Sequence, residues 1–334
     1  MTSTLRARIA APFVCLSFAA VGLSCSSNAA DTVETTAAPV TTLAPVVDLP
    51  DVVVTYSILA AVVSELVAGV ADVVTIIPDG QDPHDFEPSA KDIEVINNAS
   101  YVVANGLNFE EGLEASLEKL HDDGGPVFFV SDHITVREMS EEGGHDHDHG
   151  DEKKDDEAKD DDHDHDHGAG DPHLWLSPGT MLEMLPALTS ELGTALNVDL
   201  STALASITAS YTALDSEIAG IMSAVETCEL VTGHDELGYF ADRYGCETIG
   251  AVIPSSTTTS EASAGELAEL KEVIAEHGAK VLFTSLGTPQ DVAEQISKET
   301  GVVIVELSTH VLGASASYAE FMRLVANQLA DALQ

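Results

Sequence analysis

The sequence predicts an α/β protein made of two Rossmann-like lobes, each with a parallel sheet, joined by a long rigid helix. Two observations predict this fold class. From Val52 onward, short apolar runs alternate with stretches of helical periodicity, which is typical of parallel α/β units. The alternation occurs in two sets, and an almost wholly helical segment separates them. We therefore expect two similar lobes and a helical link.

The first lobe is expected over residues 51–177. Four short apolar runs predict its strands: Val52–Ser57, Val73–Ile77, Tyr101–Ala104 and Val127–Val130. Helical stretches follow the first three runs, so each strand can reach a parallel neighbour through a crossover helix.

Residues 178–226 are expected to link the lobes. Their pattern is helical from Pro178 to Val225 and is interrupted near Asn197 to Asp199. A helix of about 18 residues is about 27 Å long, which is enough to span two lobes as a stiff spine.

The second lobe is expected over residues 227–334. Four apolar runs again predict strands: Glu229–Thr232, Thr248–Ile253, Val281–Thr284 and Val302–Glu306. Helices are expected between or after them, at Ala264–His277 and Tyr318–Leu333.

Residues 1–25 have the pattern of a secretory signal peptide. Arg6 and Arg8 precede an apolar run from Ile9 to Leu23, which Ser24 and Cys25 follow. The run is shorter than the roughly 20 residues of a membrane-spanning helix, which favours a signal over a transmembrane anchor. The segment VGLSC resembles a bacterial lipobox, in which Cys25 is the lipidated residue. The protein is then expected to be exported, and either lipid-anchored to the outer face of the cytoplasmic membrane or periplasmic.

The composition sets further limits. Residues 26–50 are mostly Thr, Ala, Pro and Val, which predicts a flexible tether. The formal net charge of −44 argues against nucleic acid as a partner and favours cations. Cys228 and Cys246 each open an apolar run, and export permits either a disulfide or two buried thiols. We expect a monomer.

Residues 141–171 differ in kind from the rest of the chain. Two HDHDHG segments flank a run of Asp, Glu and Lys, and a segment with so few apolar side chains is expected to be a disordered loop. Alternate residues of an extended chain lie on one side, so the loop histidines can form a weak secondary metal site, or the loop can be a solvated charged run without function. These histidines are His145, His147, His149, His163, His165 and His167.

Four other histidines each follow a predicted strand. They are His84, His173, His234 and His310. In open parallel sheets, ligands bind beyond the carboxyl ends of the strands. Two of the histidines belong to each lobe, and four imidazoles are the right number and type to close one tetrahedral zinc site. The sequence therefore predicts a metal site in the cleft between the lobes.

Residues next to these histidines support the prediction. The motif DPH occurs at both His84 and His173, and its proline restricts the backbone that aims the following imidazole. Four nearby acids can accept the ring N–H that does not bind metal, or can instead cap helices. They are Asp85, Asp171, Asp235 and Glu236.

Five segments carry a resemblance to a known family. They are QDPHDFEPS, DPHLWLSP, VTGHDELGYFADRYG, SEASAGELAEL and SYAEFMRLVANQLADAL. From about Val52 to Leu333, the chain resembles the periplasmic or lipid-anchored solute-binding receptors of zinc and manganese ABC importers. The resemblance implies two Rossmann-like lobes, a rigid linking helix and a metal in the cleft.

The resemblance also implies the ligands. His84, His173 and His234 match the three histidine ligands of the family. The fourth family ligand is usually a carboxylate, whereas His310 stands at the matching position here; Glu306 or a water are the alternatives.

The function that the resemblance implies is high-affinity Zn²⁺ binding outside the cytoplasm and delivery to an ABC permease driven by a separate ATPase subunit. The chain contains no P-loop, so the ATPase must be another chain. A manganese or iron receptor is the first alternative, although manganese prefers more carboxylate oxygens than this set offers. A zinc-buffering surface protein without a transport role is the second. We do not expect an enzyme, because neither HExxH nor GxSxG occurs in the chain.

Overall fold

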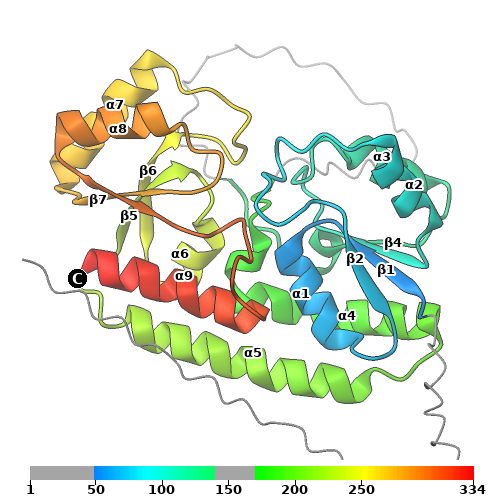
Figure 1. Ribbon diagram of the computed structural model, residues 1–334. Coiled ribbons are helices and arrows are strands. Elements are labelled where there is room, and N and C mark those ends of the chain that lie inside the picture. Colours follow the sequence, from blue (N-terminus) through cyan, green and yellow to red (C-terminus); the bar gives the residue numbers. More distant parts are fainter. Residues whose placement is uncertain (1–48, 140–169) are drawn as a thin grey trace, which may run out of the picture. The chain divides into compact units, whose positions relative to one another are not determined.

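The computed structural model describes residues 49–139 and 170–334. The predicted signal peptide with Cys25, nearly all of the tether and the six loop histidines lie outside these residues. Within them, two four-stranded parallel sheets have the orders β2-β1-β3-β4 and β6-β5-β7-β8 (Figure 1). The two sheets share one topology, as the repeated sequence pattern predicts, and the two-lobed α/β fold class is confirmed.

The described part of the first lobe contains four strands and three α-helices. The strands are β1 (Asp51–Val54), β2 (Asp72–Thr75), β3 (Tyr101–Ala104) and β4 (Val127–Phe129), and the helices are α1 (Ser57–Leu66), α2 (Ala90–Asn98) and α3 (Glu114–Asp122). A short 3₁₀ helix, η1 (Val130–His133), follows β4. β3 is buried along its whole length, as expected for a central strand that helices cover on both faces. Ser89 and Asp92 form a reciprocal capping box that fixes the start of α2.

The second lobe repeats this arrangement. Its strands are β5 (Glu229–His234), β6 (Glu247–Ile253), β7 (Val281–Thr284) and β8 (Val303–Glu306), and its helices are α6 (Gly238–Tyr244), α7 (Ala264–His277), α8 (Gln290–Thr300) and α9 (Tyr318–Leu333). Ser263 and Glu266 form the capping box that starts α7. Cys228 and Cys246 form a disulfide, with their Cα atoms 4.6 Å apart, at the amino ends of β5 and β6.

The link consists of two antiparallel helices rather than one. η2 (Leu174–Leu176) leads into α4 (Pro178–Leu196), and α5 (Ser201–Met222) returns beside it (Figure 1). The break falls where the sequence predicts it, because Asn197 adopts a left-handed conformation with φ 53°. α5 packs against α1 of the first lobe and against α9 of the second, so it is the spine that contacts both lobes.

A continuous apolar core joins the lobes through this link. One cluster of buried side chains extends from β1 through α4 and α5 to α9, and a smaller cluster lies between the second sheet and helices α7 and α8. Close packing resists large rearrangement, so wide opening about the link is disfavoured. No helix within residues 49–139 and 170–334 is both long and apolar enough to cross a membrane.

Candidate metal centre

The four predicted histidines converge on one point. His84 lies in the loop after β2, His173 directly precedes η2, His234 is the last residue of β5, and His310 lies in the loop after β8. One ring nitrogen from each residue lies within 4.8 Å of the corresponding nitrogen of every other. All four side chains are buried, with at most 3% of any residue exposed. We call these four residues the histidine cage.

The cage is assembled by the carboxyl ends of strands from both sheets. His234 stands at the end of β5, which is a central strand of its sheet and pairs with both β6 and β7. His84 and His310 follow β2 and β8, which lie at the edges of their sheets. This placement at the carboxyl edge is where parallel α/β sheets bind ligands.

The ring nitrogens are oriented for a shared ion. Nε2 of His234 lies 3.1 Å from Nε2 of His173. Nδ1 of His173 faces Asp171 at 2.9 Å, Nδ1 of His310 faces Glu236 at 3.2 Å, and Nδ1 of His84 faces Glu111 at 3.7 Å. The Nδ1 atoms of three rings therefore point to carboxylates, which leaves Nε2 as the inward nitrogen.

The cage fits a tetrahedral zinc ion. Zn–N bonds of about 2.0–2.1 Å place neighbouring ligand nitrogens about 3.3–3.4 Å apart in a tetrahedron. The observed 3.1 Å contact is close to that spacing, and the longest separation of 4.8 Å requires only a small inward movement. Among the described residues, Nε2 of His84 and Nε2 of His310 have no hydrogen-bond partner although both are buried. Buried polar atoms without a partner are costly, so a ligand that accepts their lone pairs would stabilise this arrangement.

Three of the imidazoles are held in the neutral form that metal binding needs. Burial lowers the pKa of His173, His234 and His310 well below the usual value of 6.5, and the neighbouring histidines add to the effect. Protonation would place a cation among other imidazoles in a site shielded from water. These three imidazoles are therefore neutral near pH 7, the form in which they can bind a divalent ion.

Two buried carboxylates contact the outer, Nδ1 side of two cage rings. Oδ1 of Asp171 accepts the backbone N–H of His173 as well as contacting its ring, and Arg137 Nη1 lies 3.4 Å from Oδ2. Burial raises the pKa of Asp171 to about 7, while the His173 backbone and Arg137 oppose this rise. Burial likewise raises the pKa of Glu236 to about 7, and the hydroxyl of Thr309 donates to it at 2.6 Å. Such acceptors fix the orientation of ligand imidazoles and make Nε2 more basic.

Aromatic rings line one side of the cage. The ring of Phe109 lies 4.9 Å, centroid to centroid, from that of His84, and Trp175 lies 5.5 Å from His173 and 5.6 Å from His310. The indole N–H of Trp175 donates to the backbone carbonyl of Thr309 at 2.8 Å. This bond joins the segment that carries His173 to the segment that carries His310. Since Trp175 is the only tryptophan of the chain, the tryptophan fluorescence of the protein comes from the site alone.

Of the acids that the sequence predicted to lie beside the histidines, some contact the cage and others do not. Asp171 contacts the cage as expected, and Glu236 contacts His310 rather than its sequence neighbour His234. Asp85 is exposed, so it does not support a cage ring. The predicted disordered loop also extended too far, because Asp171 at its end is buried and Gly170 forms a bridge with Glu138.

Glu111 was not predicted from the sequence. The sequence also left three alternatives for the fourth ligand of the site: His310, Glu306 or a water molecule. Glu111 lies in the loop after the carboxyl end of β3, which is the same edge of the sheet at which the cage histidines lie. This position could have identified it as a residue near the site. The structure brings His310 into the cage, whereas the side chain of Glu306 is exposed.

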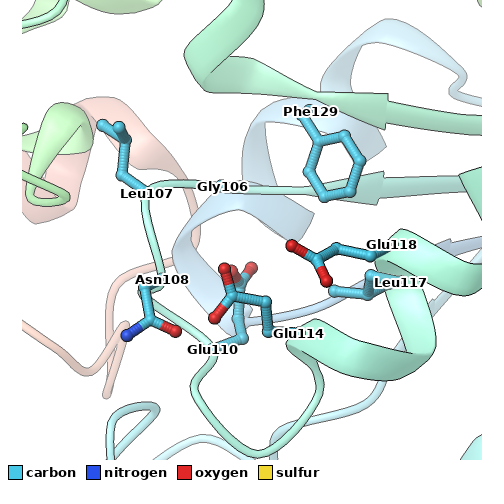
Figure 2. Close-up of a pocket in the computed structure, with 8 residues that line it drawn as sticks. All are labelled: Gly106, Leu107, Asn108, Glu110, Glu114, Leu117, Glu118 and Phe129. Atoms are coloured by element: carbon cyan, nitrogen blue, oxygen red, sulfur yellow. The ribbon is translucent and has the colours of Figure 1, made fainter. Parts of the chain in front are cut away.

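A separate cavity lies under the loop between β3 and α3 (Figure 2). Its volume of about 20 Å³ is enough for about one water molecule. Gly106, Leu107 and Asn108, which border it, all have positive φ, a costly conformation for leucine. None of the cage histidines lines it, so it is not part of the metal centre.

Comparisons with known proteins identify the family to which the chain belongs. Residues 52–332 match the family model described as zinc-uptake complex component A, periplasmic (ZnuA). The chain belongs to the ZnuA family. The high-affinity zinc uptake system protein ZnuA of Bacillus subtilis (strain 168) is 32% identical over 263 residues, which is 77% of each chain. The zinc-binding protein AdcA of Streptococcus pyogenes serotype M3 is 28% identical over 248 residues, and the match spans 47% of that longer relative.

Solved structures share the fold of this ZnuA-family chain. The periplasmic zinc-binding protein TroA from Treponema pallidum superposes with a TM-score of 0.70 at 23% identity, covering 86% of this chain and 99% of TroA. A zinc-bound ZnuA deletion mutant superposes with a TM-score of 0.69 at 22% identity, with the same coverage of 86% and 99%. Both neighbours establish the two-lobed architecture of the family.

Proposed function

We propose that this protein is an extracytoplasmic receptor that binds one Zn²⁺ in the histidine cage and delivers it to the permease of an ABC importer. The observation that carries the proposal is the convergence of four buried imidazoles, two from each lobe; within residues 49–139 and 170–334, no carboxylate belongs to this group of inward-facing atoms. Membership of the ZnuA family supports the same function.

The donor set supports zinc over manganese. Imidazole suits zinc, whereas manganese is favoured by carboxylate, carbonyl and water oxygens. The carboxylates near the cage face the Nδ1 atoms of the ligands and not the centre. A cage with four protein nitrogens also leaves no open coordination position for a reactive water, which supports a receptor over a zinc hydrolase.

Binding would proceed through residues that are already arranged. The rings present Nε2, and Asp171 and Glu236 hold the rings of His173 and His310 by their Nδ1 atoms. Because all four ligands are buried, the ion must enter and leave by local movement of loops. The continuous apolar core through α4 and α5 favours such local movement over a wide hinge motion.

The proposed receptor is exported and works with separate membrane and ATPase subunits. Export by residues 1–25 and acylation at Cys25 would hold the receptor at the outer face of the cytoplasmic membrane, where lipid alone supplies the anchor. The permease and its ATPase would be separate chains. The six histidines of residues 141–171 would offer weaker zinc sites that exchange with the cage.

The test is zinc affinity and stoichiometry in the purified protein, measured by competition with a chromophoric chelator. His84→Ala and His234→Ala are expected to abolish tight binding, because each removes a cage nitrogen. His277→Ala is the matched control, since His277 lies at the end of α7 and pairs with Glu229 far from the cage. Full affinity in both cage variants would refute the assignment. Delivery is tested separately, by growth of a deletion strain under zinc limitation.

A further inference from the structure

We propose that Glu111 and Asp82 are positioning residues that connect the ligand His84 to the Thr257–Thr259 segment of the second lobe and thereby slow the escape of the ion. The proposal rests on zinc binding at the cage. The contacts concerned join the two lobes next to the cage, and none of them is made by a metal-binding nitrogen.

Asp82 joins the two lobes with one carboxylate. Its Oδ1 accepts the backbone N–H of His84 at 3.1 Å, and its Oδ2 accepts the hydroxyl of Thr258 at 2.7 Å. Asp82 belongs to the first lobe, in the loop after β2, whereas Thr258 lies between β6 and α7 of the second lobe. The backbone of a cage ligand is therefore fixed to the opposite lobe through a single side chain.

Glu111 makes the parallel connection from the imidazole side. Its Oε1 lies 3.7 Å from Nδ1 of His84 and accepts the hydroxyl of Thr257. The hydroxyl of Thr259 also donates to Oε1, at 3.3 Å. The side chain of Glu111 is 27% exposed, so this contact lies between the buried cage and solvent.

The close approach of the lobes here depends on a small residue. A Cβ atom at Gly287 would lie 2.5 Å from Oδ2 of Asp82 and 2.5 Å from Cγ2 of Thr258. Gly287 has φ +85°, a conformation that glycine adopts without strain. A third segment, between β7 and α8, therefore leaves room for the pair formed by Asp82 and Thr258.

These contacts can respond to the metal through His84. When Nε2 binds a cation, the ring becomes more polarised and its Nδ1–H becomes a stronger donor to a carboxylate. The 3.7 Å separation between Nδ1 and Glu111 is slightly longer than a hydrogen bond, so a small movement of the Glu111 carboxylate toward the ring would complete it. Withdrawal of His84 from the ion would then require loss of the contacts to the threonine segment. The expected consequence is slow dissociation, with little effect on association.

The decisive experiment measures the zinc dissociation rate after rapid mixing with excess chelator. Thr257→Val and Thr258→Val each remove one hydroxyl at nearly constant volume, and each is expected to raise the rate about tenfold, since a hydrogen bond to a charged group is lost. Thr257→Ser and Thr258→Ser keep the hydroxyl and are expected to restore the slow rate. Thr194→Val removes an exposed hydroxyl that bonds only within α4, so it controls for the substitution itself.

A second measurement separates positioning from damage to the cage. The visible absorption spectrum of the Co²⁺-loaded variants is expected to match the wild type, because all four ligands are retained. In a double-mutant cycle, Glu111→Gln and Thr257→Val are expected to be less than additive in their effect on the rate, since both act on one contact.

The outcomes are distinct. Unchanged dissociation in both valine variants overturns the positioning role while leaving zinc binding intact. Faster dissociation in the serine variants as well, or a changed Co²⁺ spectrum, also overturns it, because the effect would then be a general disturbance of the site. A wild-type protein that binds no zinc overturns both this proposal and the proposed function.

Discussion

Removal of His310 tests the least expected ligand of the cage. Apparent binding free energies of four-ligand structural zinc sites are about 10–16 kcal/mol, or about 2.5–4 kcal/mol per ligand. At about 1.4 kcal/mol for each factor of ten, His310→Ala is expected to weaken zinc binding about 100- to 1,000-fold. Water can fill the vacated position in part, which favours the lower end of that range.

The assay for His310→Ala is equilibrium competition with chelators of graded affinity, with Trp175 fluorescence as an independent signal because its ring lies 5.6 Å from that of His310. Glu306→Gln is the control, since the Glu306 side chain is exposed and is expected to leave affinity unchanged. The reasoning is refuted if His310→Ala binds within threefold of the wild type, or if Glu306→Gln carries the loss instead.

The other predictions concern the surroundings of the cage. Asp171→Asn is expected to lower zinc affinity about 10- to 100-fold, because it weakens the acceptor that orients a ligand ring; chelator competition measures this. Affinity is expected to fall as protons compete for the imidazoles in protein without residues 143–168. Because burial lowers the pKa of three of these imidazoles well below 6.5, the fall should set in only below that pH; an affinity that already falls steeply above pH 6.5, or that stays constant at every pH at which the protein is folded, would contradict the cage. Removing the disulfide with Cys228→Ser and Cys246→Ser is expected to lower the free energy of unfolding by about 3 kcal/mol, measured in denaturant, without changing zinc affinity. Deleting Gly143 to Gly168 is expected to remove only weaker zinc equivalents in a titration.

The fold was largely predictable because hydrophobic periodicity is local. The expected strands Tyr101–Ala104 and Val281–Thr284 and the helices Ala264–His277 and Tyr318–Leu333 have the same bounds in the structure. The first strand was expected to reach Ser57, but it ends at Val54 and α1 starts at Ser57 itself. Apolar periodicity alone does not mark this change from strand to helix.

The cage was predictable from position, whereas its supporting contacts were not. His84 and His310 follow strands and His234 ends one, and parallel topology brings the carboxyl ends of strands to one edge. The carboxylates that face the Nδ1 atoms of His84, His173 and His310 depend instead on how loops from different strands fold back. Glu236 faces His310 although 74 positions separate them in numbering, and Glu111 reaches His84 from the loop after β3. Sequence proximity was a good guide only for Asp171, which contacts both the backbone N–H and the ring of His173. In the other DPH turn, Asp82 accepts the backbone N–H of His84, but the Nδ1 of that ring faces Glu111.

The two lobes are joined by apolar contacts in one region and by hydrogen bonds in another, and this difference affects how an ion can be released. Near α4 and α5 the contacts between lobes are apolar and continuous with the core. Around the cage they include carboxylates of the first lobe that accept hydrogen bonds from the second: Asp82 and Glu111 from threonine hydroxyls, and Asp79 from the backbone N–H groups of Leu312 and Gly313 at 2.7 and 2.9 Å. Water or a partner protein can replace hydrogen bonds at partly exposed sites at little net cost, whereas opening an apolar core exposes surface that nothing compensates. Under the proposed function, a permease that supplies its own donors to these acids would loosen the loops that carry His84 and His310 while the apolar contacts of α4 and α5 stay packed.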